Sequence, residues 1–362
     1  MKRLFAGMTA ALLAVVLVFS YPVKAISARS AILIDGATGR VLYEKNPTQR
    51  SLIASTTKIM TALLICEQCN VLDRMRIPKE AVGIEGSSMY LREGEVLTIQ
   101  ELLYGLMLQS GNDAAVALAI YCGGTLEGFV QMMNDKARNL GLMDTNFENP
   151  NGLDSENHYS TASDLAALAA YAMNNPVFSK IVSTQTVRVG ERYLRNHNKL
   201  LWQLEGADGI KTGYTRVAGR ILVSSASRSG RRLIAVTIAD PDDWNDHLVL
   251  MESGFQQFSE QVIVKKDQVL GTLEIAGGEY DKVELVALEN FSYPLCAEEN
   301  AEIYMPEPGF VYAPVAEGQT AGYAQVYLNE KSIGRVPLVY GKTVERQAQE
   351  TPNLWDRLLG GK

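Results

Sequence analysis

Histidine is scarce in this chain of 362 residues, which has only His158, His197 and His247. The pattern Gly-x-Ser-x-Gly, in which many hydrolases place a serine nucleophile beside a histidine base, does not occur. The sequence also shows no complete set of metal ligands, so we expect neither a metal nor a cofactor. Any acid–base chemistry would have to use side chains other than histidine.

Cysteine is also rare, and its four positions are Cys66, Cys69, Cys122 and Cys296. Cys66 and Cys69 have the C-x-x-C spacing of redox and metal sites. A zinc site needs four ligands, and neither a second pair nor a nearby histidine supplies the rest. Small buried side chains near a helix end are the simpler interpretation. A disulfide between the two stays open outside the cytosol.

Positive charge is in deficit. Lysine and arginine number 34 against 41 aspartates and glutamates, which gives a net charge of −7 and a pI near 5.2. Phosphate binding needs a basic face, and no run of basic residues provides one, so nucleic acid is excluded as a partner. The length is that of about two domains and allows a sizeable core.

One long apolar run is present, at the N-terminus. Lys2 and Arg3 precede an apolar stretch over residues 4–19, and Val23-Lys24-Ala25 offers small residues around a cut after Ala25. We therefore expect residues 1–25 to be a signal peptide and the protein to be exported. An uncleaved anchor is the alternative, although the run falls short of the ~20 residues that a spanning helix needs.

Residues 26–258 combine helical patterns with strand patterns. Residues 30–35 and 40–45 alternate around a turn and predict a hairpin. Thr98 to Glu101 has the capping-box pattern, and Asn112 or Asp113 is expected to cap the next helix. Further helices are expected from residue 52 and over 114–122, 126–140, 162–173 and 244–258, and further strands over 186–190, 209–214, 220–226 and 232–239. This order predicts an α+β fold, with an antiparallel sheet, flanking helices and an all-helical insertion.

Residues 259–345 predict a small all-β domain without any catalytic constellation. Its strands are expected over 262–265, 271–275, 282–287, 302–305, 324–328 and 332–338. Residues 346–362 are expected to be a linker and a short amphipathic tail, in which Leu354, Trp355, Leu358 and Leu359 share one helical face. Contact with a membrane interface and a packed terminal turn both fit this tail.

Three short motifs follow one another along the first domain: Ser55-Thr56-Thr57-Lys58, Ser110-Gly111-Asn112 and Lys211-Thr212-Gly213. Each is common by chance, but the ordered set is not. On a helix, Lys58 shares a face with Ser55, so its amine can reach the hydroxyl and act as the base. Burial and the second amine, Lys211, would lower the pKa of Lys58 enough for that role, and the two amines would titrate as a coupled pair. Together the motifs indicate acyl transfer through a serine ester.

The triple resembles that of the penicillin-binding proteins and serine β-lactamases. Its surroundings are similar to the low-molecular-mass serine D-alanyl-D-alanine carboxypeptidases. The segments that carry the resemblance are SLIASTTKIMTALL at 51–64, LQSGNDAA at 108–115, FENPNGL at 147–153, HYSTASDL at 158–165 and DGIKTGYTRVAG at 208–219. The resemblance implies a β-lactamase/transpeptidase-like domain followed by a small all-β domain, at the outer face of the cytoplasmic membrane or in the cell wall. It also implies peptidoglycan stem peptides ending in D-Ala-D-Ala as substrates and β-lactams as inhibitors.

Carried over residue by residue, the resemblance implies a role for each motif position. Ser55 is the acylated nucleophile, Lys58 its base, and Ser110 relays a proton to the departing D-alanine. Asn112 holds the peptide amide of the donor, while Lys211 and Thr212 bind its terminal carboxylate. Gly213 leaves room for substrate along the strand edge. The backbone N–H groups of Ser55 and Tyr214 form the oxyanion hole.

Two further residues of the matched segments have no catalytic role in this scheme. His158 is interpreted as structural. Glu148 stands in Phe-Glu-Asn-Pro and not in the Glu-x-x-Leu-Asn pattern of class A β-lactamases, so rapid β-lactam hydrolysis is not expected. A β-lactamase remains one alternative, and a non-catalytic penicillin-sensing or wall-binding protein the other. The balance between carboxypeptidase, endopeptidase and transpeptidase activity also stays open.

Overall fold

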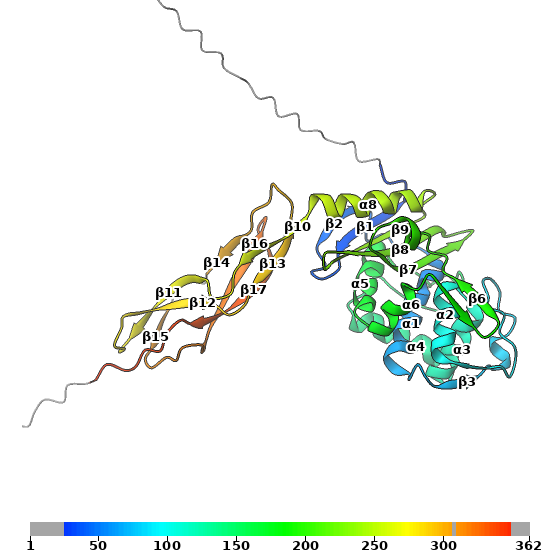
Figure 1. The fold of residues 1–362 in the computed structure, drawn as a ribbon, viewed down its shortest axis with the longest axis horizontal. Coiled ribbons are helices and arrows are strands. Elements are labelled where there is room, and N and C mark those ends of the chain that lie inside the picture. Colours follow the sequence, from blue (N-terminus) through cyan, green and yellow to red (C-terminus); the bar gives the residue numbers. More distant parts are fainter. Residues whose placement is uncertain (1–24, 306–308, 349–362) are drawn as a thin grey trace, which may run out of the picture.

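The computed structural model describes residues 25–305 and 309–348. Two bodies lie one after the other along the chain, a larger one of helices and sheet and a smaller one of strands (Figure 1). The predicted signal peptide, except for Ala25, and the predicted amphipathic tail lie outside the described residues. The expected α+β fold with a trailing all-β domain is confirmed.

The larger body is built on a five-stranded antiparallel sheet in the order β2-β1-β9-β8-β7. The strands are β1 (Ser30–Asp35), β2 (Val41–Lys45), β7 (Ala207–Thr215), β8 (Gly219–Arg228) and β9 (Arg231–Ile238). Side chains of a strand alternate between the two faces, and in β8 both faces are apolar. Ile221 and Val223 join the core on one face, whereas Leu222 and Ala226 join the core on the other. The sheet therefore needs cover on both sides.

Helices provide that cover (Figure 1). Helix α8 (Asp243–Gln257) packs on one face, and α5 (Ala162–Met173) packs on the other. Beyond α5 lies the helical block, which consists of α1 (Lys58–Gln68), α2 (Ile99–Leu108), α3 (Asn112–Gly123), α4 (Leu126–Asn139) and α6 (Pro176–Val182). Short elements complete it: the 3₁₀ turns η1 (Ala54–Thr57) and η2 (Lys79–Ala81), helix α7 (Leu200–Gln203), and the hairpins β3 (Arg74–Arg76) with β4 (Val96–Thr98) and β5 (Thr186–Val189) with β6 (Arg192–Arg195).

Side chains cap the starts of helices α2, α4, α5 and α6, whereas α1, α3, α7 and α8 begin without a side-chain cap. Thr98 and Glu101 form the expected capping box of α2. Helix α3 was expected to be capped by Asn112 or Asp113, but Gly111 is its N-cap and no side chain caps it. Both predicted caps have partners outside the helix end: Asn112 accepts a hydrogen bond from Lys58, and Asp113 accepts from the backbone N–H groups of Met89 and Leu91.

The smaller body contains a two-stranded ribbon and a six-stranded sheet in the order β14-β16-β17-β12-β11-β15. The strands are β10 (Ser259–Val264), β11 (Val269–Ala276), β12 (Lys282–Ala287), β13 (Phe291–Leu295), β14 (Glu302–Tyr304), β15 (Phe310–Tyr312), β16 (Thr320–Leu328) and β17 (Lys331–Tyr340). Strands β13 and β15 were not predicted. The first contains a proline and the second is three residues long, so neither carries a readable alternation.

The two bodies join with one residue between α8 and β10 (Figure 1). That residue is Phe258, and the guanidinium of Arg40 lies 5.1 Å from its ring centroid and 5.3 Å from that of Tyr293. Arg40 also donates a hydrogen bond to the carbonyl oxygen of Pro294 and forms an ion pair with Glu299 at 2.5 Å. A side chain of the first hairpin thus binds the second body.

The four cysteines are all free thiols, so Cys66 and Cys69 form no disulfide here. Burial raises the pKa of Cys66 to about 12, and the Cys69 thiol shares a hydrogen bond with Cys122. Among the described residues, no single helix is long and apolar enough to cross a membrane. Helices α3 and α4 pass that test only as a pair, and they meet at an 85° bend.

Candidate active site

Ser55 lies on the 3₁₀ turn η1, and Lys58 is the first residue of α1. The expected single helix is therefore a tight turn that passes into an α-helix, but the two residues still face each other: Lys58 Nζ is 3.0 Å from Ser55 Oγ. The Lys58 side chain is fully buried. Its amine also donates to Asn112 Oδ1 at 2.7 Å and to the Asn151 carbonyl at 2.6 Å.

These two acceptors orient the Lys58 amine. Burial, with the nearby charge of Lys211 as a second cause, lowers the pKa of Lys58 well below its usual value. A neutral amine has two N–H bonds and one lone pair. When both N–H bonds go to Asn112 and Asn151, the lone pair is directed at the hydroxyl of Ser55. The geometry therefore suits proton removal from Ser55.

Asn151 could not be found from the sequence as a partner of Lys58, because it acts through a backbone carbonyl that every residue has. The segment 147–153 holds that carbonyl in place. Asn149 Oδ1 accepts a hydrogen bond from Gly152 N at 2.7 Å, and Thr61 donates to the Pro150 carbonyl at 2.7 Å. A Cβ on Gly152, whose φ is +85°, would lie 1.9 Å from the Ala54 carbonyl oxygen, so this close approach needs glycine.

His158 stabilises the same region through hydrogen bonds to Glu148 and Thr57. Its Nδ1 accepts a hydrogen bond from Glu148 N at 3.1 Å, so its Nε2 carries the proton and donates to Thr57 Oγ1 at 2.7 Å. Burial lowers the pKa of His158 to about 4, so the ring is neutral at physiological pH. These contacts agree with the structural interpretation of His158. The Glu148 carboxylate bonds to Ser155 and Asn157 and does not line the pocket.

The second motif forms the corner between α2 and α3. Ser110 is buried and has φ +58°, a conformation that few residues other than glycine adopt. Asn112 lies behind it with both ends of its carboxamide occupied, because Oδ1 binds Lys58 and Nδ2 donates to the Glu85 carbonyl at 2.5 Å. A substrate amide would have to replace one of these contacts to reach Asn112.

The third motif lies on β7, at the edge of the sheet. Lys211 is buried behind the strand, and its burial lowers its pKa to about 7. Its amine donates to the Thr212 carbonyl at 2.8 Å. A Cβ on Gly213 would lie 3.3 Å from both Ala54 Cβ and Ser55 N, so glycine lets β7 approach the serine turn. Tyr214 is largely exposed.

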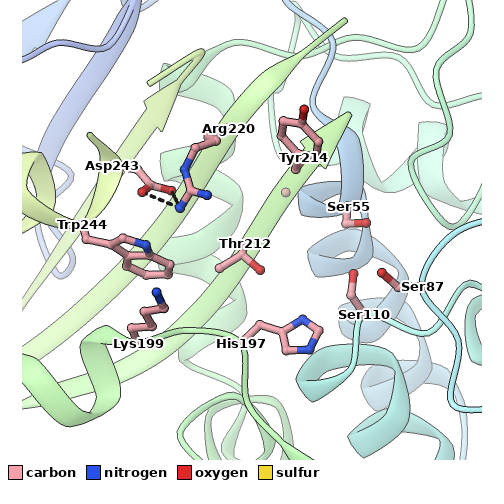
Figure 2. Close-up of a pocket in the computed structure, with 11 residues that line it drawn as sticks. Ser55, Ser87, Ser110, His197, Lys199, Thr212, Tyr214, Arg220, Asp243 and Trp244 are labelled. Atoms are coloured by element: carbon pink, nitrogen blue, oxygen red, sulfur yellow. Dashed lines mark hydrogen bonds and ion pairs between the residues drawn. The ribbon is translucent and has the colours of Figure 1, made fainter. Parts of the chain in front are cut away.

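A pocket of about 320 Å³ opens where these segments meet (Figure 2). Of the predicted site residues, Ser55, Ser110, Thr212, Gly213 and Tyr214 line it, whereas Lys58, Asn112 and Lys211 lie behind its wall. The lining also includes residues that the motifs did not indicate: Ser87, His197, Lys199, Arg220, Asp243 and Trp244. No group of three or more metal-ligating side chains exists among the described residues.

Three of these additional residues surround an indole at one end of the pocket (Figure 2). Arg220 Nη2 donates to both oxygens of Asp243, at 2.7 and 2.8 Å. The Arg220 guanidinium and the Lys199 amine each lie 5.7 Å from the ring centroid of Trp244. Two cations therefore lie beside Thr212, and one of them is held by a carboxylate.

A serine faced by a buried lysine, in a pocket at the edge of an antiparallel sheet, is the arrangement of the penicillin-interacting serine acyltransferases. Comparison with known proteins narrows that class. Residues 18–242 match the D-alanyl-D-alanine carboxypeptidase family, and residues 258–346 match the C-terminal domain of penicillin-binding protein 5. The chain belongs to the D-alanyl-D-alanine carboxypeptidases of the low-molecular-mass penicillin-binding protein type.

Relatives and solved structures extend over most of the chain. It is 36% identical over 313 residues to the D-alanyl-D-alanine carboxypeptidase DacF of Bacillus subtilis, which covers 82% of this chain and 80% of the relative. It is 34% identical over 340 residues to DacC of Escherichia coli, with 88% and 85% covered. The structure of penicillin binding protein 5 from Haemophilus influenzae superposes with a TM-score of 0.75 at 30% identity, over 89% of this chain and 98% of the other.

Proposed function

We propose that this protein removes the C-terminal D-alanine from peptidoglycan stem peptides through an ester on Ser55. The observation that carries the proposal is the 3.0 Å approach of Lys58 Nζ to Ser55 Oγ on the pocket wall. In the first step Ser55 Oγ attacks the carbonyl carbon of the penultimate D-alanine, and its proton passes to the neutral amine of Lys58. The backbone N–H groups of Ser55 and Tyr214 stabilise the negative oxygen that forms.

The leaving group departs as the tetrahedral intermediate collapses. The bond between the carbonyl carbon and the leaving nitrogen breaks, Ser110 relays a proton to that nitrogen, and free D-alanine leaves. Water then attacks the Ser55 ester and releases the shortened peptide. Asn112 is assigned to the peptide amide of the donor, and its carboxamide exchanges one internal contact when substrate binds.

Positive charge explains the choice of a free C-terminus. Lys211 lies behind Thr212, and a bound carboxylate would raise its lowered pKa, because an opposite charge favours the cation. Of the two coupled amines, Lys58 would then be the one that stays neutral. Lys199 and Arg220 add two cations to the same end of the pocket. We assign these two residues to selectivity for the terminal carboxylate.

Truncation of both cations should reduce recognition of that carboxylate. In Lys199→Ala/Arg220→Ala, we expect KM for a peptide with a free C-terminus to rise about tenfold or more, because charged hydrogen bonds are lost. A peptide amidated at its C-terminus should be affected much less. The matched control is Arg228→Ala, which removes an arginine from the other end of β8. Equal losses on both peptides would contradict the assignment.

Labelled penicillin separates a carboxypeptidase from a β-lactamase. The segment around Glu148 lacks the class A deacylation pattern, and the Glu148 side chain points away from the pocket residues to Ser155 and Asn157. We therefore expect one label per chain, on Ser55, to persist for many minutes after excess penicillin is removed. Loss of the label with multiple turnovers would favour the β-lactamase alternative. A chain that acquires label but releases no D-alanine from peptide would favour the sensing alternative.

The proposed location rests on the signal peptide and the tail that the sequence predicts. We assign residues 1–25 to a cleaved signal peptide, 26–258 to the catalytic domain, 259–345 to the β domain and 346–362 to a linker and tail. The protein would then work at the outer face of the cytoplasmic membrane or in the cell wall, where peptidoglycan lies. Leu354, Trp355, Leu358 and Leu359 are the residues through which the tail would contact a membrane surface.

A further inference from the structure

Two buried carboxylates meet beside the first described residues of the chain. Asp240 follows β9 and Asp246 lies in the first turn of α8, and each is 1% exposed. Both approach the Ser27 hydroxyl, Asp240 Oδ1 at 2.7 Å and Asp246 Oδ2 at 2.8 Å. Asp246 Oδ2 also accepts a hydrogen bond from Ser27 N at 2.5 Å.

The hydrogen-bond donors nearby do not satisfy both carboxylates. Asp242 N donates to Asp240 Oδ1 at 3.1 Å, on the oxygen that already faces Ser27. The Ser27 hydroxyl has one proton, so it can donate to only one of the two carboxylates. Asp240 Oδ2 and Asp246 Oδ1 are buried and have no hydrogen-bond donor among the described residues. Two like charges buried together are unfavourable unless a positive group or an extra proton joins them.

The charged groups around the pair are engaged elsewhere. On β2, Lys45 Nζ donates to the Ile26 carbonyl at 2.7 Å, and Tyr43 has its pKa raised by burial and by Asp246. On β8, Arg220 is bound to Asp243. Burial raises the pKa of Asp240 and has a larger effect than the hydrogen bond from the Thr237 hydroxyl on β9, which lowers it.

The backbone nitrogen of Ile26 lies within reach. Two consecutive backbone nitrogens are separated by three bonds, so Ile26 N is at most about 3.7 Å from Ser27 N. Since Ser27 N is 2.5 Å from Asp246 Oδ2, Ile26 N lies within about 6 Å of that carboxylate. Ile26 itself is buried, whereas Ala25 is exposed.

We propose that Asp240 and Asp246 form the binding site of the protein's own N-terminal ammonium group, which is created when the chain is cut between Ala25 and Ile26. Water hydrolyses that peptide bond: hydroxide goes to the Ala25 carbonyl carbon, and Ile26 N becomes an amine that takes a second proton at neutral pH. The positive charge then lies beside the two carboxylates. The inference rests on the signal cleavage proposed above, and it is independent of the acylation chemistry.

If the ammonium binds the two carboxylates, the stability that it adds to the folded protein depends on pH. The carboxylates must be ionised and the amine must be protonated. The amine's folded pKa is raised by the pair, so its contribution is present below its unfolded pKa of about 8 and is lost as pH rises through the folded value. Burial raises the pKa of Asp240, so this carboxylate loses its charge as pH falls toward that raised value. The gain in stability should therefore be greatest near neutral pH, below the unfolded pKa of the amine of about 8.

Two forms of the mature chain test the proposal. One begins at Ile26, released from a fusion partner by a protease that leaves no extra residue, and the other carries two glycines before Ile26. The second form moves the ammonium by about 7 Å and keeps its charge. We expect the Ile26 form to have a Tm higher by about 3 °C or more at pH 7. Its α-amine should also react several-fold more slowly with an amine-specific acylating reagent.

Asp246→Asn gives the sharpest comparison. It should lower the Tm of the Ile26 form and leave unchanged or raise that of the glycine-extended form, so the difference between the two disappears. Glu252→Gln, on the same helix, should leave the difference intact, and Asp240→Asn replaces Asp246→Asn if that variant does not fold. Equal Tm values and equal amine reactivity in the two forms would overturn the proposal.

A second experiment determines where the natural precursor is cut. Protein exported with its own leader should begin at Ile26 by intact mass and N-terminal sequencing. A different first residue would also overturn the proposal. Release of D-alanine measured on the same samples reports separately on the proposed function.

Discussion

Replacement of Ser55 by alanine should abolish release of D-alanine from a diacyl-D-Ala-D-Ala peptide. The variant loses the only atom that forms the ester, while Lys58, the strand edge and the pocket remain. Loss of a nucleophile that acts together with its base costs about 10⁴-fold or more in kcat. The measurement is D-alanine release under saturating peptide, with intact mass after incubation with penicillin to detect the ester. We expect no added mass.

The matched control for this variant is Ser253→Ala. Ser253 lies on α8, where its hydroxyl donates to the Leu250 carbonyl, and it does not line the pocket. Its activity should equal that of the parent chain. If Ser55→Ala kept more than a few per cent of the activity, the ester mechanism would be wrong, and another nucleophile in the same pocket would have to be sought.

Replacement of Lys58 by methionine should have an effect of similar size, because it removes the base and keeps the length of the side chain. We expect D-alanine release and penicillin acylation to fall together, by about 10³-fold or more. The variant also leaves Asn112 Oδ1 and the Asn151 carbonyl without their donor, so a lower Tm is expected as well. Lys136→Met, in the same helical block, is the control for loss of a lysine.

The pH profile distinguishes a lost base from a disturbed structure. The active form of Lys58 is the neutral amine, so kcat/KM should rise as pH increases through the pKa of Lys58, and it should fall again as Lys211 loses the proton that it needs to bind the substrate carboxylate. Burial and Lys211 place the rising limb well below pH 10.5, the value of an ordinary lysine. Residual activity of Lys58→Met should lack the limb. A parent enzyme that became active only near the pKa of an ordinary lysine would show that Lys58 is not the base.

The sequence predicted those parts of the site that consist of ordered motifs on regular elements. Ser55 with Lys58, Ser110 with Asn112, and Lys211 to Gly213 lie around one pocket, because the strand pattern of residues 209–214 and the capping box of α2 are local signals. Three features had no such signal. The Asn151 carbonyl acts through backbone, Trp244 and Arg220 meet across separate elements, and Gly111 replaces a side-chain cap because tertiary contacts engage both candidate caps.

The same limit applied to the fold. Strands with a long run of buried residues, such as β8, were found within a few residues of their observed ends, whereas β13 and β15 were missed. These short strands are specified by the neighbours with which they pair, β10 and β11, and not by their own residues. The meeting of Ser27 with Asp246 joins residues 219 positions apart and leaves no trace in a local pattern.

The join at Phe258 gives the molecule a fixed length. One residue separates α8 from β10, and Arg40 of the first body binds Glu299 of the second, so the described join contains no flexible linker on which the pocket could swing. If the far end of the β domain were held at a surface, the length of this domain would set the distance between that surface and the pocket. The enzyme would then reach peptidoglycan only at that distance, and a longer or shorter β domain would change the distance.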